Sequence, residues 1–228
     1  MDVFRDPASG QACDAFLAEL LPGQKNFLNF GVVNPDGSLR CSALPFEPGT
    51  DFSAQSYVSD TLKNRDFSVG SYLLEPTTNR PKISFGYPVY GTDGQLNGVL
   101  FASLSLEWLN DFSVRISLPS GATLMLLDRN GVVVVREPWS EEWIGRDLSN
   151  SSLFARLRTT RDEGSFEDTG LDGVSRLYGF TALYQKNEVA SYVLIGFSER
   201  VLYQEALTSF SRNLILLIIA TIASVLTA

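Results

Sequence analysis

The first half of the chain contains side chains that can recognise a small molecule. Arg65 carries a rigid, planar guanidinium that can hold a carboxylate through two parallel hydrogen bonds. Tyr57, Tyr72 and Tyr87 offer aromatic ring faces with hydroxyl groups, and Ser84 adds a further hydroxyl. A pocket that combines an apolar lining with a few such polar groups suits a small organic anion. These five residues are therefore the candidate ligand-binding set.

Arg65 has an alternative role, because acidic residues lie close to it in the sequence. It can equally be a surface or helix-capping residue that is paired with Asp60 or Asp66. Surface ion pairs of this kind are common. The sequence leaves both roles open.

The strand expected over residues 82–90 presents two different faces. Every second residue shares a face, so one set is Ile83, Phe85 and Tyr87 and the other is Lys82, Ser84 and Gly86. Only one set can line a pocket, and the sequence does not decide which.

The composition excludes several kinds of chemistry. The 228 residues contain no histidine and only two cysteines, so a Ser-His-Asp nucleophile, a His-ligated metal or haem and a multi-thiolate cluster cannot be built within this chain. The net charge of −8 has the wrong sign for binding nucleic acid. No phosphate-binding glycine loop is recognisable. We expect no cofactor, no metal and no catalytic residue in this region.

Cys13 and Cys41 form the one candidate disulfide. Cys13 lies in an expected helix and Cys41 at the end of an expected strand, 28 positions later (41 − 13). A bridge would join helix to sheet and would persist only in an oxidising compartment. The alternative is a pair of free, buried thiols.

The two ends of the chain suggest a membrane context. Residues 214–228 are uncharged and apolar, but shorter than the roughly 20 residues that cross a bilayer. We interpret them as the start of a truncated transmembrane helix; a buried terminal helix of a soluble fold is the alternative. Residues 198–212 have helical apolar spacing and would lead into it. No signal peptide is visible at the N-terminus, so export would need a preceding segment.

The body of the chain reads as one module that occurs twice. Hairpin turns are expected at Asp36-Gly37, Asp93-Gly94 and Asn130-Gly131. Asn130 follows Asp36, and Asn187 follows Asp93, by the same 94 positions (130 − 36 and 187 − 93). Each copy has the order strand, turn, strand, polar segment with a short helix, then strand, turn, strand. This order predicts an α+β fold with two antiparallel sheets.

The segment at residues 57–109 carries a resemblance to a known family. It is similar to the membrane-distal module of a double Cache domain, most specifically in the YPV, DG and GVL elements between Pro81 and Leu109. The resemblance covers most of residues 25–200. It implies tandem PAS-like sheets beside a long N-terminal helix, outside a bacterial membrane, as the sensing part of a chemoreceptor, histidine kinase or diguanylate cyclase.

The chain also departs from the amino-acid-binding members that it resembles. Those members carry an Arg-x-Trp-Tyr segment where this chain has Tyr57-Val58-Ser59-Asp60 and, later, Lys63-Asn64-Arg65-Asp66. An amino-acid ligand is therefore one option among several. The N-terminal helix is also shortened.

We expect five segments and one function. The function is an extracytoplasmic ligand sensor of a transmembrane receptor, which binds a small molecule in the distal module and passes a conformational change through its C-terminal helix. The alternative is a membrane-tethered, periplasmic protein-interaction module.

The resemblance also implies a homodimer at the inner membrane, with the second module supporting rather than binding. The segments are an N-terminal helix remnant (1–24), a distal PAS-like module (25–110), a proximal PAS-like module (111–197), a connecting helix (198–213) and the start of a transmembrane helix (214–228).

Overall fold

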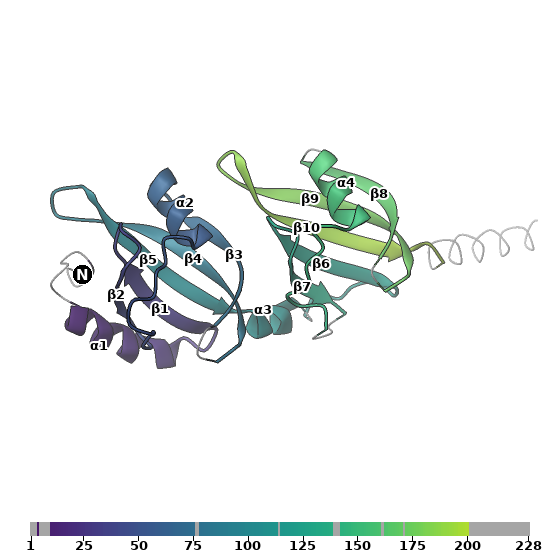
Figure 1. Ribbon diagram of the computed structural model, residues 1–228. Coiled ribbons are helices and arrows are strands. Elements are labelled where there is room, and N and C mark those ends of the chain that lie inside the picture. Colours follow the sequence, from purple (N-terminus) through teal and green to yellow (C-terminus); the bar gives the residue numbers. More distant parts are fainter. Residues whose placement is uncertain are drawn as a thin grey trace, which may run out of the picture.

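The chain forms two five-stranded antiparallel sheets that lie side by side along the long axis of the molecule (Figure 1). This computed structural model describes Phe4 and residues 10–75, 78–113, 115–138, 142–160, 162–170 and 172–200. The two sheets have the same strand order, and each carries one helix on the same side (Figure 1).

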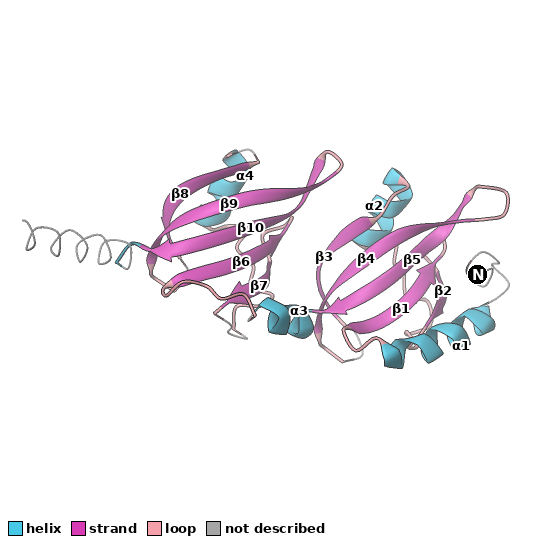
Figure 2. Cartoon of the chain, turned by 180° about the vertical axis from the view of Figure 1, so that it is seen from behind, coloured by secondary structure: helices cyan, strands magenta, loops and turns pink. Residues whose placement is uncertain are grey.

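The first module contains the first sheet and two helices that flank it. Its sheet has the strand order β2-β1-β5-β4-β3, so β2 and β3 are the edge strands. Helix α2 packs on one face, and α1 packs against β1 and β2 (Figure 2). Its elements are α1 (Gly10–Leu20), the 3-10 turn η2 (Leu21–Gly23), β1 (Phe27–Val33), β2 (Leu39–Ser42), α2 (Ser56–Asn64), β3 (Ser68–Leu74), β4 (Pro81–Tyr90) and β5 (Leu96–Ser105).

The second module follows a short helix, α3 (Leu106–Ser113), and repeats the elements of the first module. Its sheet has the equivalent order β7-β6-β10-β9-β8. Strand β9 begins 94 positions after β4 (175 − 81), and α4 begins 96 positions after α2 (152 − 56). The elements are β6 (Ala122–Asp128), β7 (Val133–Glu137), α4 (Ser152–Thr159), β8 (Glu163–Thr169), β9 (Ser175–Gln185) and β10 (Glu188–Ser198). The predicted tandem α+β fold is confirmed.

The hairpin turns form where the sequence predicts them. Gly37, between β1 and β2, has φ +88°, and Gly131, between β6 and β7, has φ +87°. These values lie in the left-handed region that glycine adopts without a steric penalty. Asp-Gly and Asn-Gly pairs therefore set the register of both hairpins.

An apolar cluster joins the two modules. Ile83 and Leu104 of the first sheet pack with Leu106 of α3 and with Val134 and Val135 of β7. All five side chains are buried, so the second sheet shares a core with the first. The connection between the modules is a packed interface rather than a free linker.

Cys13 of α1 and Cys41 of β2 form a disulfide, as the sequence predicts. The two Cα atoms are 5.8 Å apart, and both residues are buried with Leu17 and Val32. The bridge ties the N-terminal helix to the edge of the first sheet.

The predicted membrane segment lies outside the described residues, as does most of the predicted connecting helix. Among the helices that the structure does describe, none combines the length and the apolar character needed to span a bilayer.

Reducing the disulfide should lower stability measurably. The bridge closes a loop over a sequence separation of 28, for which the chain-entropy estimate is about 3–4 kcal/mol. In guanidinium denaturation, the oxidised protein should unfold at a higher midpoint than the same protein with dithiothreitol. A Cys13→Ser/Cys41→Ser double variant is the control and should show no response to the reductant. Recovery of two free, alkylatable thiols from protein that was never reduced would contradict the assignment.

Candidate functional site

The face of the first sheet that α2 covers, called here the inner face, has an apolar half. Tyr57 and Val58 of α2 pack against Val99 and Phe101 of β5, together with Phe52 from the segment before α2. The Tyr57 and Phe52 rings both lie 5.9 Å from the Phe101 ring. Gly86 of β4 permits this packing, because a Cβ there would lie 2.2 Å from the Tyr57 carbonyl oxygen.

The other half of the inner face carries a row of buried polar side chains. Asn29 of β1 pairs directly with Ser103 of β5, and Ser103 pairs directly with Ser84 of β4. All three are fully buried, and the two serine hydroxyls are 2.9 Å apart. Two positions along β4, Lys82 lies opposite Ser105. These five residues are named the polar row.

Lys82 ends the polar row in a buried ion pair. Its Nζ atom lies 2.6 Å from Oε2 of Glu75, which directly follows β3. The Lys82 residue is 4% exposed and Glu75 is 2% exposed. Burying both charges costs several kcal/mol of desolvation, which their attraction and further hydrogen bonds must offset. A pair of this kind is therefore an uncommon feature that a binding role would explain.

Phe46 lies beside the ion pair. Its ring centroid is 6.0 Å from the Lys82 Nζ atom, and its ring packs edge-on against Phe52 at 5.1 Å. Phe46 also lines an open cavity of about 380 Å³, together with Leu39, Asp36 and Asp51. This side chain therefore contacts both the open cavity and the surroundings of the buried ammonium.

The segment that carries Phe46 is held in place by the polar row itself. The Asn29 side-chain oxygen accepts hydrogen bonds from the Leu44 and Phe30 amides at 3.0 and 2.9 Å. Ser42 donates to the Leu44 carbonyl oxygen at 2.5 Å. Asn29 thus positions the loop after β2 over the sheet.

The Tyr57 side chain of α2 lies near the buried ion pair, close enough for the charge of Glu75 to act on its hydroxyl. Burial raises the pKa of its hydroxyl above the usual range, and the negative charge of Glu75 adds to the rise. The hydroxyl therefore stays protonated at physiological pH. Nearby on α2, the buried Thr61 hydroxyl has no hydrogen-bond partner among the described residues.

Of the five predicted ligand-binding residues, the structure brings Tyr57 and Ser84 together on the inner face. Tyr72 lies instead at the contact between the modules, where its amide donates to Asp128 at 3.0 Å and its ring joins the shared apolar cluster. Burial raises the pKa of the Tyr72 hydroxyl.

Tyr87 and Arg65 occupy other surroundings. Tyr87 is 59% exposed on the opposite face of β4, where it lines an apolar groove of about 480 Å³ with Phe67 and Phe85. Arg65 has an exposed side chain. It ends α2 with φ +52°, and its amide donates to the Thr61 carbonyl oxygen. Ligand contacts from Tyr72, Tyr87 and Arg65 stay predictions.

Sequence reasoning did not select Lys82, Glu75, Ser103, Asn29 or Phe46. One signal was available for Lys82, because strand alternation places it on the same face as Ser84. Choosing Ser84 as a candidate therefore implied a lysine beside it on the inner face. No comparable signal marks Glu75 or Phe46, whose positions depend on loop geometry.

The second module buries cations at the corresponding place. Arg176, which follows Lys82 by the repeat offset of 94 (176 − 82), forms two hydrogen bonds with Asp172 at 2.7 and 2.8 Å. Arg136 shares the same carboxylate at 3.0 Å and lies 4.4 Å from the Trp143 ring. Hydrogen bonding from Arg176 lowers the pKa of Asp172, and burial raises the pKa of Tyr178.

The repeated sheets, each with one helix over its inner face, define a tandem PAS-like sensor fold. The chain belongs to the Cache domain family, which matches residues 1–204. Cache domains are extracellular sensor modules of membrane receptors, and they bind ligands rather than catalyse reactions. No curated protein sequence matches the chain.

Solved sensor domains share this fold. The ligand-binding domain of the Pseudomonas aeruginosa PAO1 amino acid chemoreceptor PctB, in complex with L-Gln, has a TM-score of 0.66 at 18% identity, over 94% of this chain and 86% of that chain. The ligand-binding domain of Mlp24 with asparagine has a TM-score of 0.57 at 21% identity, over 86% and 79%. An extracellular domain described as that of the histidine kinase rpHK1S-Z16 has a TM-score of 0.65 at 20% identity, over 85% and 80%.

Breaking the buried ion pair from one side should destabilise the protein strongly. Lys82→Met leaves Glu75 as an unpaired buried carboxylate, which costs about 3–5 kcal/mol. The double variant Lys82→Met/Glu75→Leu removes both charges and should recover most of that loss. Urea denaturation of the three proteins measures the difference. Equal stability of the single variant and the unmodified protein would show that Lys82 and Glu75 are not a buried pair.

Proposed function

We propose that this chain is the extracytoplasmic sensor region of a transmembrane receptor and that it binds a small, carboxylate-bearing molecule at the polar row of the first module. The family and the shared fold support a sensor role. The position of the site and the class of ligand rest on the chemistry of the inner face.

The observation that carries this proposal is the incomplete hydrogen bonding of Lys82. An ammonium has three N–H donors, and within the described part of the chain Glu75 is the only acceptor that Lys82 reaches. A buried donor without an acceptor is costly. A ligand carboxylate would supply the missing acceptors through charge-assisted hydrogen bonds, which are about twice as strong as neutral ones.

The surroundings of Lys82 fit the rest of such a ligand. Ser84 and Ser103 provide neutral hydroxyls for orientation, and the Tyr57 and Phe46 rings provide apolar surface. A carboxylate would enter beside Phe46, from the cavity that this side chain lines. Glu75 offers an acceptor for an ammonium group, so a zwitterion also belongs to the class. PctB and Mlp24 bind amino acids, but this chain lacks the Arg-x-Trp-Tyr segment.

The orientation at the membrane is part of the same proposal. The first module (25–110) would be membrane-distal and the second (111–197) membrane-proximal. The helix predicted over residues 198–213 would carry the conformational change into the transmembrane segment of an inner-membrane receptor. The output domain would then lie on the cytoplasmic side.

A thermal-shift screen of carboxylates, L-amino acids and polyamines tests the ligand class. We expect stabilisation by compounds that carry a carboxylate. For a compound that raises Tm, calorimetry should show roughly ten- to hundredfold weaker binding to Lys82→Met/Glu75→Leu, which corresponds to losing a charge-assisted hydrogen bond of about 1.5–3 kcal/mol. Lys25→Met, which removes an exposed lysine outside the polar row, is the matched control and should bind normally.

Three results of this screen would overturn the assignment. If only polyamines raise Tm, the anion class is wrong. If the double variant binds the compound as tightly as the unmodified protein, the site is elsewhere. If Arg65→Ala weakens binding and the double variant does not, Arg65 is the carboxylate clamp.

Self-association is a separate expectation, because related sensors resemble parallel dimers and residues 198–212 have the apolar spacing of an amphipathic helix. Sedimentation of the full chain in detergent should show a dimer. A monomer at every concentration tested would contradict this expectation. The matched comparison is the chain ending at residue 197, which lacks that segment and should associate less.

A further inference from the structure

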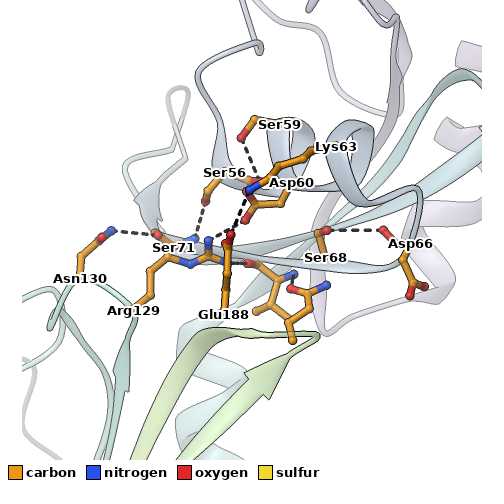
Figure 3. Close-up of polar contacts among 12 residues, drawn as sticks. Ser56, Ser59, Asp60, Lys63, Asp66, Ser68, Ser71, Arg129, Asn130 and Glu188 are labelled. Carbon is orange, nitrogen blue, oxygen red and sulfur yellow. Dashed lines mark hydrogen bonds and ion pairs between the residues drawn. The ribbon is translucent and has the colours of Figure 1, made fainter. Parts of the chain in front are cut away.

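Two turns of the second module contact α2 and β3 of the first module (Figure 3). One is the β6–β7 turn, which contains Asp128, Arg129 and Asn130. The other is the β9–β10 hairpin, which contains Gln185, Lys186 and Glu188. Figure 3 shows Arg129 and Glu188 approaching α2, and Asn130 approaching Ser71 of β3. We call these two turns the clamp.

The clamp completes the outer edge of β3. An edge strand leaves backbone N–H and C=O groups without a neighbouring strand. Here Val69 donates its N–H to Gln185 at 3.1 Å and accepts from Arg129 at 3.1 Å. The Tyr72 amide donates to Asp128 at 3.0 Å. Side chains of the second module thus replace the hydrogen bonds of a missing strand.

The clamp also holds α2. Arg129 forms an ion pair with Asp60 at 2.6 Å, and both side chains are largely buried. Lys63 pairs with Glu188 at 2.9 Å, but this pair is more than half exposed, so it contributes little. Lys186 donates to the Asn64 carbonyl oxygen at 2.5 Å. Arg129 is therefore the strongest polar contact of the second module with the helix.

The β6–β7 turn is rigid enough to transmit this contact. One Asp128 oxygen accepts hydrogen bonds from the Asn130 and Val132 amides, both at 2.9 Å. Its other oxygen holds Tyr72. The turn that presents Arg129 is therefore tied to β3 by the same buried carboxylate.

Helix α2 connects the clamp to the polar row. Its Tyr57 and Thr61 side chains pack on the inner face of the first sheet, while Asp60 and Lys63 face the clamp. All four positions lie on the same nine-residue helix, within about two turns. If α2 moves away from the clamp, its Tyr57 and Thr61 side chains therefore move relative to the inner face.

We infer that Arg129 is a positioning residue for the ligand site: it holds α2 against the polar row, so that the second module sets how readily that row opens. This inference rests on the proposed function, because it concerns the regulation of the same site. Coupling between two sites is reciprocal. Occupancy of the polar row therefore changes the strength of the clamp by the same factor as the clamp changes ligand affinity.

The chain offers a direct reporter of this opening that needs no ligand. It contains four lysines, Lys25, Lys63, Lys82 and Lys186, and Lys82 is the buried one of the polar row. Acetylation by sulfo-N-hydroxysuccinimide acetate, followed by peptide mass spectrometry, gives the rate at which each ammonium becomes accessible. Lys25 is exposed and far from α2 in the sequence, so it serves as the internal reference.

Arg129→Ala and Asp60→Ala should each raise the acetylation rate of Lys82 by roughly three- to thirtyfold, as expected for coupled contacts. The double variant should add little to either single variant. Arg158→Ala is the matched control, because this exposed arginine of α4 forms no hydrogen bond or ion pair with the first module among the described residues. It should leave the Lys82 rate unchanged, and Lys25 should react equally in all proteins.

Amide hydrogen exchange of β5 separates local opening from global unfolding. Exchange at Val99 and Phe101 should stay slow in Arg129→Ala while Lys82 acetylation rises. An unchanged Lys82 rate in Arg129→Ala, or an equal rise at the β5 amides, would overturn the positioning role. Because acetylation uses no ligand, this outcome is independent of the carboxylate screen, whose failure would overturn the proposed function instead.

Discussion

Burial of the Lys82 ammonium is the constraint around which the first module is organised. A charge inside a sheet needs a counter-charge and neighbouring dipoles, since an unpaired ammonium in an apolar interior would cost far more free energy. Glu75 supplies the counter-charge from the end of β3, and Ser84 and Ser103 lie on the same face as a hydrogen-bonded pair. Phe46 and Tyr57 then close the inner face around them. The ion pair and the buried serines together form the polar half of this face.

The two modules share a buried pair of a cation and a carboxylate, but the residues that form the pair differ. Both modules place a cation at the second position of the equivalent strand, with a carboxylate from the preceding hairpin. In the second module two guanidiniums share one carboxylate, and Trp143 covers one of them. The bidentate Arg176–Asp172 contact occupies both oxygens of its carboxylate, whereas Lys82 and Glu75 meet through one oxygen. Among the described residues both cations keep an N–H without an acceptor, at Nε of Arg176 and at the Lys82 ammonium.

The sequence predicted the features that depend on local chemistry. The Asp-Gly and Asn-Gly turns and the tandem repeat follow from residues close in sequence or from a repeated spacing. The Cys13–Cys41 pairing follows from the cysteine count, since the chain has two. The site was predicted only in part, because strand alternation defines two faces without saying which one α2 covers. Tyr57 and Ser84 are on that face, but Tyr72 is at the module contact and Tyr87 is on the opposite face. Asp128 and Arg129 were not selected, since a turn that reaches another module leaves no periodic signal.

The clamp on β3 has a consequence for the order in which the protein folds. A ribosome delivers the first module before the second, and domains generally fold in that order. Until the β6–β7 turn has formed, the outer edge of β3 lacks the partners that Asp128, Arg129 and Gln185 provide. An open edge of this kind is a template for pairing with another chain. The newly made first module is therefore exposed to aggregation during the interval in which the next residues emerge, and the second module acts as its protection as well as its neighbour.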